Sequence, residues 1–353
     1  MTTQSRRFAS RPEWTGLGVM LALGAGVVAI GAGWVSGAAE TAVLAVMLVS
    51  VIGLVWTAFV GGLETRRALA PYGLLKPGIL WLSLFFLAPL WTMFRMSLSS
   101  TKSRFDFFPS FSWHWSNYGD ALSDFAPQFG RSFAYAAVAT VLTLVIGYPL
   151  AYVIAFRGGR YRSVLLGLVA VPFFTSYLIR TLAWQNLLAD SGPVVSALTT
   201  LRLDAPLEWL NIMQDGRLIN TPAAVIGGLT YNFLPFMILP LYVSLEKIDV
   251  RLVDAAMDLY TTASGAFRRV VLPLSLPGVF AGSLLVFIPA AGDFVNAQFL
   301  GSPSTTMIGN SIQNQFLVQR NLPLASAMSF VLMAVITVSV LVYARFRGTD
   351  DLV

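Results

Sequence analysis

Two ionisable residues lie deep inside long apolar runs of the sequence, where a charge is costly. Asp293 stands about 16 residues into one run and Arg180 about 17 residues into another. At 1.5 Å per helical residue, both would lie roughly 25 Å from the start of their helices, at similar depth. Ionisable residues in such positions pair with one another or mark a substrate pathway. Asp293 and Arg180 are therefore the first candidates for function.

Polar and aromatic residues near the same depth are candidates to accompany these charges. Asn296 and Gln298 follow Asp293, and Asn232 lies in a third apolar run. The aromatic candidates are Tyr177, Trp184, Tyr231 and Phe294. Two interpretations stay open: Asp293 and Arg180 satisfy each other within a helix bundle, or these residues line a path for a solute.

Composition excludes several other kinds of site. The chain has no Cys and a single His, His114, so it cannot form a thiolate site or a cluster of His ligands. Its lysines, Lys76, Lys102 and Lys247, do not occur in a G-x-x-x-x-G-K-[ST] phosphate-binding loop. We therefore expect no enzyme activity, metal or cofactor in this chain itself.

The composition is that of a membrane protein. Of the 353 residues, 56% are apolar and 11% charged, and the mean hydropathy is +0.71. Soluble proteins carry about 25% charged residues, so these charges are too few to cover a surface in water. The net charge of +6 comes with Arg residues scattered between apolar runs. That pattern fits membrane topology and not nucleic-acid binding.

About eight apolar stretches are long enough to cross a bilayer, which needs roughly 20 residues per helix. The sequence therefore predicts an all-α polytopic membrane protein. The predicted spans are residues 14–35, 41–63, 77–98, 132–156, 163–188, 222–244, 277–300 and 324–343. Pro172 and Arg180 interrupt the fifth of these spans.

The basic residues predict the orientation of the spans. Arg and Lys gather before the first span and after the second, fourth, sixth and eighth. Placing these segments in the cytoplasm lets eight spans alternate, with both termini inside. The pair Arg6-Arg7 loosely resembles an export signal, but a long apolar run followed at once by a second span favours a retained helix.

One predicted cytoplasmic connection, Glu246 to Leu276, is much longer than the others. Apolar or small residues recur in it at helical spacing and predict a short amphipathic helix: Leu252, Ala255, Ala256 and Leu259. Its other side carries Arg251, Asp254 and Asp258. Pro273 and Pro277 predict a break before the seventh span. The pattern alone allows a helix on the membrane surface or one that docks on a partner.

This connection resembles the EAA loop of ABC importer permeases, which docks in a groove of the ATPase subunit. That motif reads E-A-A, three residues, G, nine residues, I, one residue and L-P. Asp254-Ala255-Ala256 matches its start, and Val270 and Leu272-Pro273 match its end at the same spacing. The resemblance implies a coupling loop with these residues: Asp254, Ala255, Ala256, Asp258, Tyr260, Gly265, Leu272 and Pro273.

Two positions depart from the motif. Asp254 replaces Glu, which is a mild change, and Tyr260 replaces Gly. Glycine is favoured where a turn needs a positive φ. We therefore expect either another turn geometry, which could use Gly265, or a remodelled coupling contact.

The resemblance extends from about Ile79 to the end of the chain, and it is to the spermidine/putrescine branch of these permeases. It rests on GYPLAYVIAF (147–156), PFFTSYLIRTLAWQNLL (172–188), NFLPFMILPLYVSLEKID (232–249), LPLSLPGVFAGSLLVFIPAAGDF (272–294) and MIGNSIQNQFL (307–317). It implies a six-helix type I permease core in residues 77–353, with the coupling loop at 246–276. Residues 1–76 would be a cytoplasmic tail and two extra helices.

The resemblance also implies partners in a prokaryotic inner membrane. These are two ATP-binding subunits that hold ATP and Mg, a second and distinct permease subunit, and an extracytoplasmic solute-binding protein. For a polyamine, Asp293 would pair with an ammonium group, and aromatic faces would add about 0.5–2 kcal/mol each. Related branches move iron(III), thiamine or opine-like solutes. A secondary transporter is a further alternative, which predicts paired broken helices in two related halves.

Overall fold

A computed structural model describes residue 78 and residues 81–100, 109–202, 204–209, 212–260 and 262–345. The predicted spans 14–35 and 41–63 lie outside the described residues. The chain divides into two compact units. One comprises residues up to Asn117 together with Asn321–Ala327, and the other comprises Tyr118–Arg320 together with the residues from Met328 onward.

Helices long and apolar enough to cross a membrane occur at four predicted positions. They are Ala126–Arg157, Pro222–Glu246, Ala263–Ala291 and Leu322–Arg345. A fifth candidate span is a pair of helices, Gly159–Phe174 and Tyr177–Thr200, bent by 92° at the break between them. At the third predicted span the structure describes a shorter apolar helix, Leu84–Ser97. The helical, multi-span class is confirmed, and the total of eight spans stays a prediction.

The described part of the first unit contains a helical segment and a small two-stranded sheet. Its π-helix η1 (Ser83–Leu87) leads into α4 (Ala88–Ser97). Strands β1 (Ser99–Ser100) and β2 (Ser110–Phe111) then pair antiparallel, and the Asn117 amide donates to the carbonyls of Ser97 and Ser99 at 2.9 Å. This sheet is an addition to the predicted all-helical fold, because strands of two residues are too short to show an alternating pattern.

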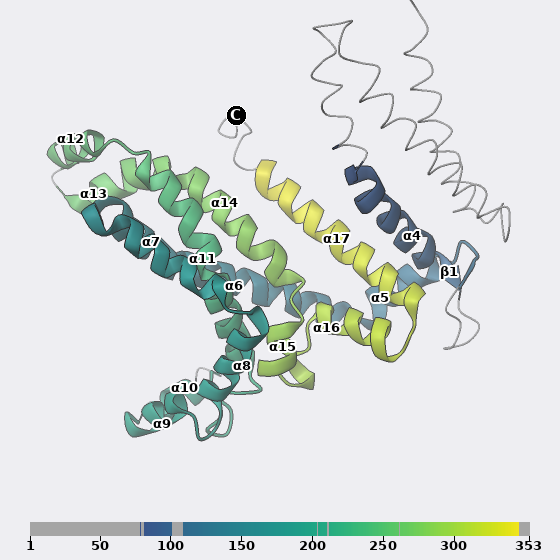
Figure 1. Cartoon of the computed structure of the whole chain (residues 1–353). Coiled ribbons are helices and arrows are strands. Elements are labelled where there is room, and N and C mark those ends of the chain that lie inside the picture. The colour runs from purple at the N-terminus through teal and green to yellow at the C-terminus, as the bar shows by residue number, and fades with distance from the viewer. Residues whose placement is uncertain are drawn as a thin grey trace, which may run out of the picture. The chain divides into compact units, whose positions relative to one another are not determined.

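The second unit is helical in its described part (Figure 1). It starts with α5 (Ser116–Asp124), which begins just before the boundary between the units, and α6 (Ala126–Tyr152). The next elements are η2 (Val153–Arg157), η3 (Gly159–Tyr161), α7 (Arg162–Ala170), η4 (Val171–Phe174), α8 (Tyr177–Leu188), α9 (Pro193–Thr200), α10 (Asp204–Trp209), α11 (Pro222–Glu246), α12 (Val250–Tyr260) and α13 (Ala263–Ala266). The last are η5 (Phe267–Val271), α14 (Leu272–Ala291), α15 (Val295–Leu300), η6 (Pro303–Thr305), α16 (Ile308–Gln313), η7 (Asn314–Val318) and α17 (Leu322–Arg345), which starts in the first unit.

Helix α11 forms the centre of the second unit, where it packs against α6 and α14 (Figure 1). It is apolar on all sides, as expected for a helix surrounded by others. Its fully buried side chains include Val225, Leu229, Met237 and Leu241. The other elements are therefore positioned by their contacts with this helix.

Glycine allows α14 to approach α11 closely. A Cβ atom on Gly278 would lie 2.5 Å from Ser244 Cβ and 2.8 Å from the carbonyl oxygen of Pro240. The second of these is a backbone atom, which cannot move aside as a flexible side chain can. Even an alanine at this position would therefore push the two helices apart.

The substitution Gly278→Ala should lower the free energy of unfolding by about 1–3 kcal/mol, because it overpacks this contact. Gly167→Ala in α7 is the matched control, since no atom lies within 4 Å of a Cβ built there. The control should be neutral or stabilising, because alanine favours a helix more than glycine does. Thermal unfolding of the purified protein measures both, and equal stabilities would contradict this account of the packing.

The fifth predicted span is correct in position but is bent. Pro172 lies in the short η4, and after it the backbone of Thr175 and Ser176 is extended, with ψ of 138° at each residue. Helical hydrogen bonding stops there, and α8 starts again at Tyr177 in a new direction. Pro172 itself lies at the start of η4, where the lack of a backbone N–H costs little, and the chain leaves the helical conformation only at Thr175.

The predicted boundaries of the seventh span, 277–300, are wrong at both ends. The helix runs without interruption from Ala263 to Ala291, so Pro273 and Pro277 do not break it. Pro273 lies just after the π-helical η5, whose altered hydrogen-bond pattern allows a residue without a backbone N–H inside the helix. The break comes instead at Gly292–Phe294, before α15.

Candidate functional site

Asp293 lies in the break between α14 and α15. The backbone N–H of Asn296 donates to Asp293 Oδ1 at 2.8 Å, so the carboxylate caps the first turn of α15. The hydroxyl of Tyr177 donates to Oδ2 at 2.5 Å. Asp293 is only 8% exposed, and both of these donors are neutral. The carboxylate is thus held in place without a cation.

Five buried or half-buried residues form a polar cluster around this carboxylate: Tyr177, Thr181, Asn232, Asp293 and Asn296. The Asn296 amide donates to the Tyr177 hydroxyl at 2.6 Å. The Asn232 amide donates to Asn296 Oδ1 at 3.1 Å and to Thr181 Oγ1 at 3.4 Å. The cluster therefore connects α8, α11 and α15 at the point where two spans are broken. One acceptor in it, Asn232 Oδ1, is buried without a partner.

Arg180 lies beside this cluster but does not pair with Asp293. Its Cζ atom lies 5.5 Å from the centroid of the Tyr177 ring and 5.9 Å from that of Phe173. The side chain is 8% exposed, and its Nε and Nη1 atoms are buried without a hydrogen-bond partner. No ion pair joins Arg180 to Asp293 in the described part of the chain. The interpretation in which these two residues satisfy each other is therefore wrong for this conformation.

The other predicted residues are not part of the polar cluster. Trp184 and Tyr231 contact each other, with ring centroids 5.4 Å apart. Phe294 is exposed, and Gln298 is exposed and accepts from the Asn310 amide at 3.4 Å. Among the predicted residues, Tyr177, Asn232, Asp293 and Asn296 come together.

Two polar residues at this site were missed in the sequence. Thr181 lies one helical turn after Tyr177, so its spacing was a usable signal that it shares a face with the tyrosine. Asn310 donates to the carbonyl of Phe294 at 2.7 Å and so holds α16 against the break. Its neighbour Gly309 fits there because a Cβ would lie 2.6 Å from the Gly292 carbonyl oxygen. Nothing in the sequence around Asn310 indicates this long-range contact.

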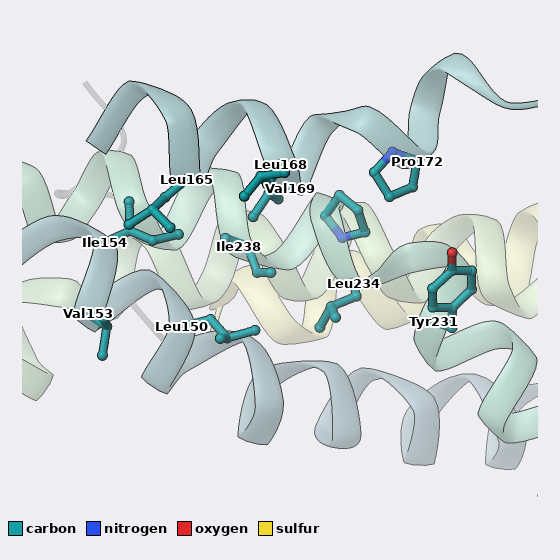
Figure 2. Close-up of a pocket in the computed structure, with 11 residues that line it drawn as sticks. Leu150, Val153, Ile154, Leu165, Leu168, Val169, Pro172, Tyr231, Leu234 and Ile238 are labelled. Atoms are coloured by element: carbon teal, nitrogen blue, oxygen red, sulfur yellow. The ribbon is translucent and has the colours of Figure 1, made fainter. Parts of the chain in front are cut away.

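A separate, apolar groove of about 330 Å³ lies between α6 with η2, α7 with η4, and α11 (Figure 2). Leu150, Leu165 and Ile238 line it, and Pro172 and Tyr231 lie toward one end. These walls offer almost no hydrogen-bonding atoms, so the groove does not suit a charged solute. The polar cluster remains the candidate site for an ionic group.

The predicted amphipathic helix is confirmed as α12, but its buried face differs from the prediction. Of the four residues expected to share the apolar face, only Ala256 is buried, and the half-buried Val253 packs against the core beside it. Leu252 is 53% and Leu259 77% exposed, and Ala255 is exposed as well. The helix therefore presents an uncovered apolar edge in this unit.

Both residues that depart from the EAA motif lie in helix α12. Tyr260 is the last residue of α12. Gly265 lies inside α13, where its N–H donates to Thr262 Oγ1 at 3.2 Å, and it has no positive φ. The expectation that Gly265 supplies the turn is therefore wrong. Leu272 and Pro273 lie in the first turn of α14.

Metal-ligating side chains do not gather in groups of three or more among the described residues. In the described part of this unit, the buried acidic and basic side chains are Asp293 and Arg180.

The sequence matches the model of one protein family, the binding-protein-dependent transport system inner membrane component, over residues 144–347. The chain belongs to this family. It is 39% identical over 267 residues to the spermidine/putrescine transport system permease protein PotB of Haemophilus influenzae. The aligned region covers 75% of this chain and 90% of that protein. It is 40% identical to PotB of Escherichia coli over 61% of this chain and 75% of that protein.

More distant relatives share the fold. The inner membrane ABC transporter permease protein YdcU of Escherichia coli is 30% identical over 236 residues, which cover 63% of this chain and 72% of that protein. A chain in the crystal structure of a bacterial ABC transporter that imports alginate superposes with a TM-score of 0.51 at 18% identity. That match covers 78% of this chain and 93% of the other. The fold is thus shared with a chain whose sequence is only 18% identical.

The substitution Asn296→Ala should destabilise the protein by about 2–4 kcal/mol, because it leaves the Tyr177 hydroxyl and the Asn232 amide buried without this partner. The control is Gln298→Ala, two positions along the same helix, where one long hydrogen bond is lost at an exposed site. The control should change stability by less than about 0.5 kcal/mol. Unfolding of the two purified variants in the same detergent measures the difference, and similar losses would show that the cluster does not hold the breaks together.

Proposed function

We propose that this chain is the membrane-spanning permease subunit of an ATP-driven importer of polyamines such as spermidine and putrescine. The observation that carries the proposal is the 39% identity to a spermidine/putrescine permease along 90% of that protein's length. Transport of iron(III), thiamine or opine-like solutes is the weaker alternative. A secondary transporter is weaker still, since family membership favours a system that uses a binding protein.

The polar cluster is the part of this chain that suits a polyamine. Asp293 offers a buried carboxylate whose two donors, Tyr177 and the Asn296 backbone, are neutral. An ammonium group in the cluster would therefore give Asp293 the cationic partner that the described residues do not supply. The rings of Tyr177 and Phe233, with centroids 6.1 Å apart, provide aromatic faces nearby. The Trp184–Tyr231 pair is a second aromatic surface for the methylene spacers.

The exposed edge of α12 is the part that suits an ATPase subunit. Leu252, Ala255 and Leu259 lie on one side of the helix, uncovered by their own chain. The buried Ala256 and the half-buried Val253 attach α12 to the core of the unit, so force on the exposed edge would reach the spans. A docked partner would cover apolar surface that is otherwise unfavourable in water.

The wider assembly follows from the same family. We infer two ATP-binding subunits that hold ATP and Mg, a second permease chain and an extracytoplasmic solute-binding protein. This chain would be a non-enzymatic subunit in a prokaryotic inner membrane, with both termini in the cytoplasm. Residues 77–353 would form the six-helix core, and residues 1–76 would add a tail and two further spans to make eight.

The test is ATPase activity of the complex in nanodiscs, assembled with its ATPase subunits, second permease and binding protein. Binding protein loaded with spermidine or putrescine should stimulate hydrolysis several-fold over unloaded binding protein. An active complex that responds to another solute and not to polyamines would overturn the substrate. A chain that binds no ATPase subunit would overturn the proposed class.

The substitution Ala255→Glu should abolish this stimulation and weaken the binding of the ATPase subunits, because it places a charge in the proposed contact. Ala263→Glu is the matched control, since Ala263 is also exposed but lies at the start of α13, where an acidic residue suits the helix dipole. The control should retain stimulation. Equal activity of both variants would show that α12 is not the coupling contact.

A further inference from the structure

Two buried charges of opposite sign lie near one another without being paired. Among the described residues, Arg180 and Asp293 are the basic and acidic side chains that are buried, each 8% exposed. Asp293 accepts from neutral donors, whereas Nε and Nη1 of Arg180 contact no acceptor. An unpaired charge is strongly unfavourable in a low-dielectric interior. Formation of an ion pair between Arg180 and Asp293 would therefore be favourable.

Tyr177 contacts both charges and separates them. Its ring centroid lies 5.5 Å from Arg180 Cζ, and its hydroxyl lies 2.5 Å from Asp293 Oδ2. Tyr177 and Arg180 are three residues apart on α8, so they share one side of that helix. The hydroxyl occupies a position on the carboxylate that a guanidinium nitrogen would otherwise take.

The backbone before Tyr177 is a suitable place for movement. Tyr177 is the first residue of α8, and it follows the extended Thr175 and Ser176 at the 92° bend. A few extended residues at the end of an element are the usual hinge of a domain movement. A change in the bend would move Tyr177 relative to α15, which carries the other half of the cluster.

We propose that Arg180 competes with the ammonium group of the solute for Asp293, and that Tyr177 keeps Arg180 away while the solute binds. The proposal rests on the proposed function as a polyamine importer. In the conformation described here, Asp293 accepts hydrogen bonds from neutral donors and has no cationic partner. When Tyr177 withdraws, Arg180 pairs with Asp293, and this internal ion pair displaces the ammonium. Arg180 is thus a positioning residue that acts through Asp293 and favours release.

A competing guanidinium has a measurable signature. The Tyr177 hydroxyl stabilises the separated state, so its removal should favour the ion pair and lower solute binding. If Arg180 causes that loss, then removal of its charge should reverse it. A purely structural role for both residues predicts no such reversal, and it predicts that Gln and Lys at position 180 have similar effects.

The test is spermidine uptake by the assembled complex in proteoliposomes, with four variants compared. Tyr177→Phe should lower uptake at least about tenfold, because Arg180 can then pair with Asp293 and compete with the ammonium group. Arg180→Gln should lower the maximal rate by about threefold, because release is no longer assisted. The double variant Tyr177→Phe/Arg180→Gln should match Arg180→Gln alone, and so exceed Tyr177→Phe. Tyr177→Phe/Arg180→Lys keeps the positive charge and should stay as low as Tyr177→Phe.

The outcomes distinguish failure of the proposed competition by Arg180 from failure of the proposed polyamine transport. Rescue by Gln without rescue by Lys, at equal amounts of assembled complex, supports competition by charge. Losses that multiply in the Gln double variant overturn it, and rescue by Gln and Lys alike overturns it in favour of a steric effect. A wild-type complex that hydrolyses ATP but takes up no spermidine overturns the proposed function, and this inference with it.

Discussion

A helix that stops inside a membrane leaves polar groups that no water can satisfy, and this constraint explains the centre of the structure. Two spans stop here, one at Thr175–Ser176 and the other at Gly292–Phe294. The side chains beside one break satisfy those beside the other: Tyr177 donates to Asp293, and the Asn296 amide donates to Tyr177. The polar cluster therefore joins the two breaks through hydrogen bonds between side chains.

The packing around the cluster keeps the two breaks together. Helix α11 contributes Asn232 from a fully packed core, and α14 approaches it closely because Gly278 has no side chain. At the other end of the unit, α12 is attached through Ala256 and Val253 while its opposite edge stays uncovered. One helical unit thus contains a buried polar cluster and an exposed apolar edge, and contacts between its helices connect them. The proposed role in a transporter that a partner subunit drives would use both features.

The helical class, several of the spans and the amphipathic helix could be predicted from the sequence because each of these depends on local pattern. The apolar runs at 222–244 and 324–343 were long enough to be recognised without their neighbours. The boundaries of the seventh span were wrong because proline is tolerated after a π-helical turn, whereas Gly292 and Asp293 end the helix through contacts with α8 and α16. The buried face of α12 was predicted wrongly because Leu252 and Leu259, although apolar, are exposed among the described residues. The separation of Arg180 from Asp293 depends on the position of one tyrosine ring, which no spacing reveals.

The central claim is that the carboxylate of Asp293 contacts the solute during transport. The most direct measurement is spermidine uptake by the assembled complex with Asp293→Asn, which removes the charge but keeps the side-chain oxygen that caps α15. We predict an uptake at least about tenfold lower, with normal assembly and unchanged basal ATP hydrolysis, because an ionic partner is lost while one side-chain oxygen still accepts from the Asn296 N–H. Uptake kinetics equal to those of the wild type would contradict the account and leave Asp293 with a structural role alone.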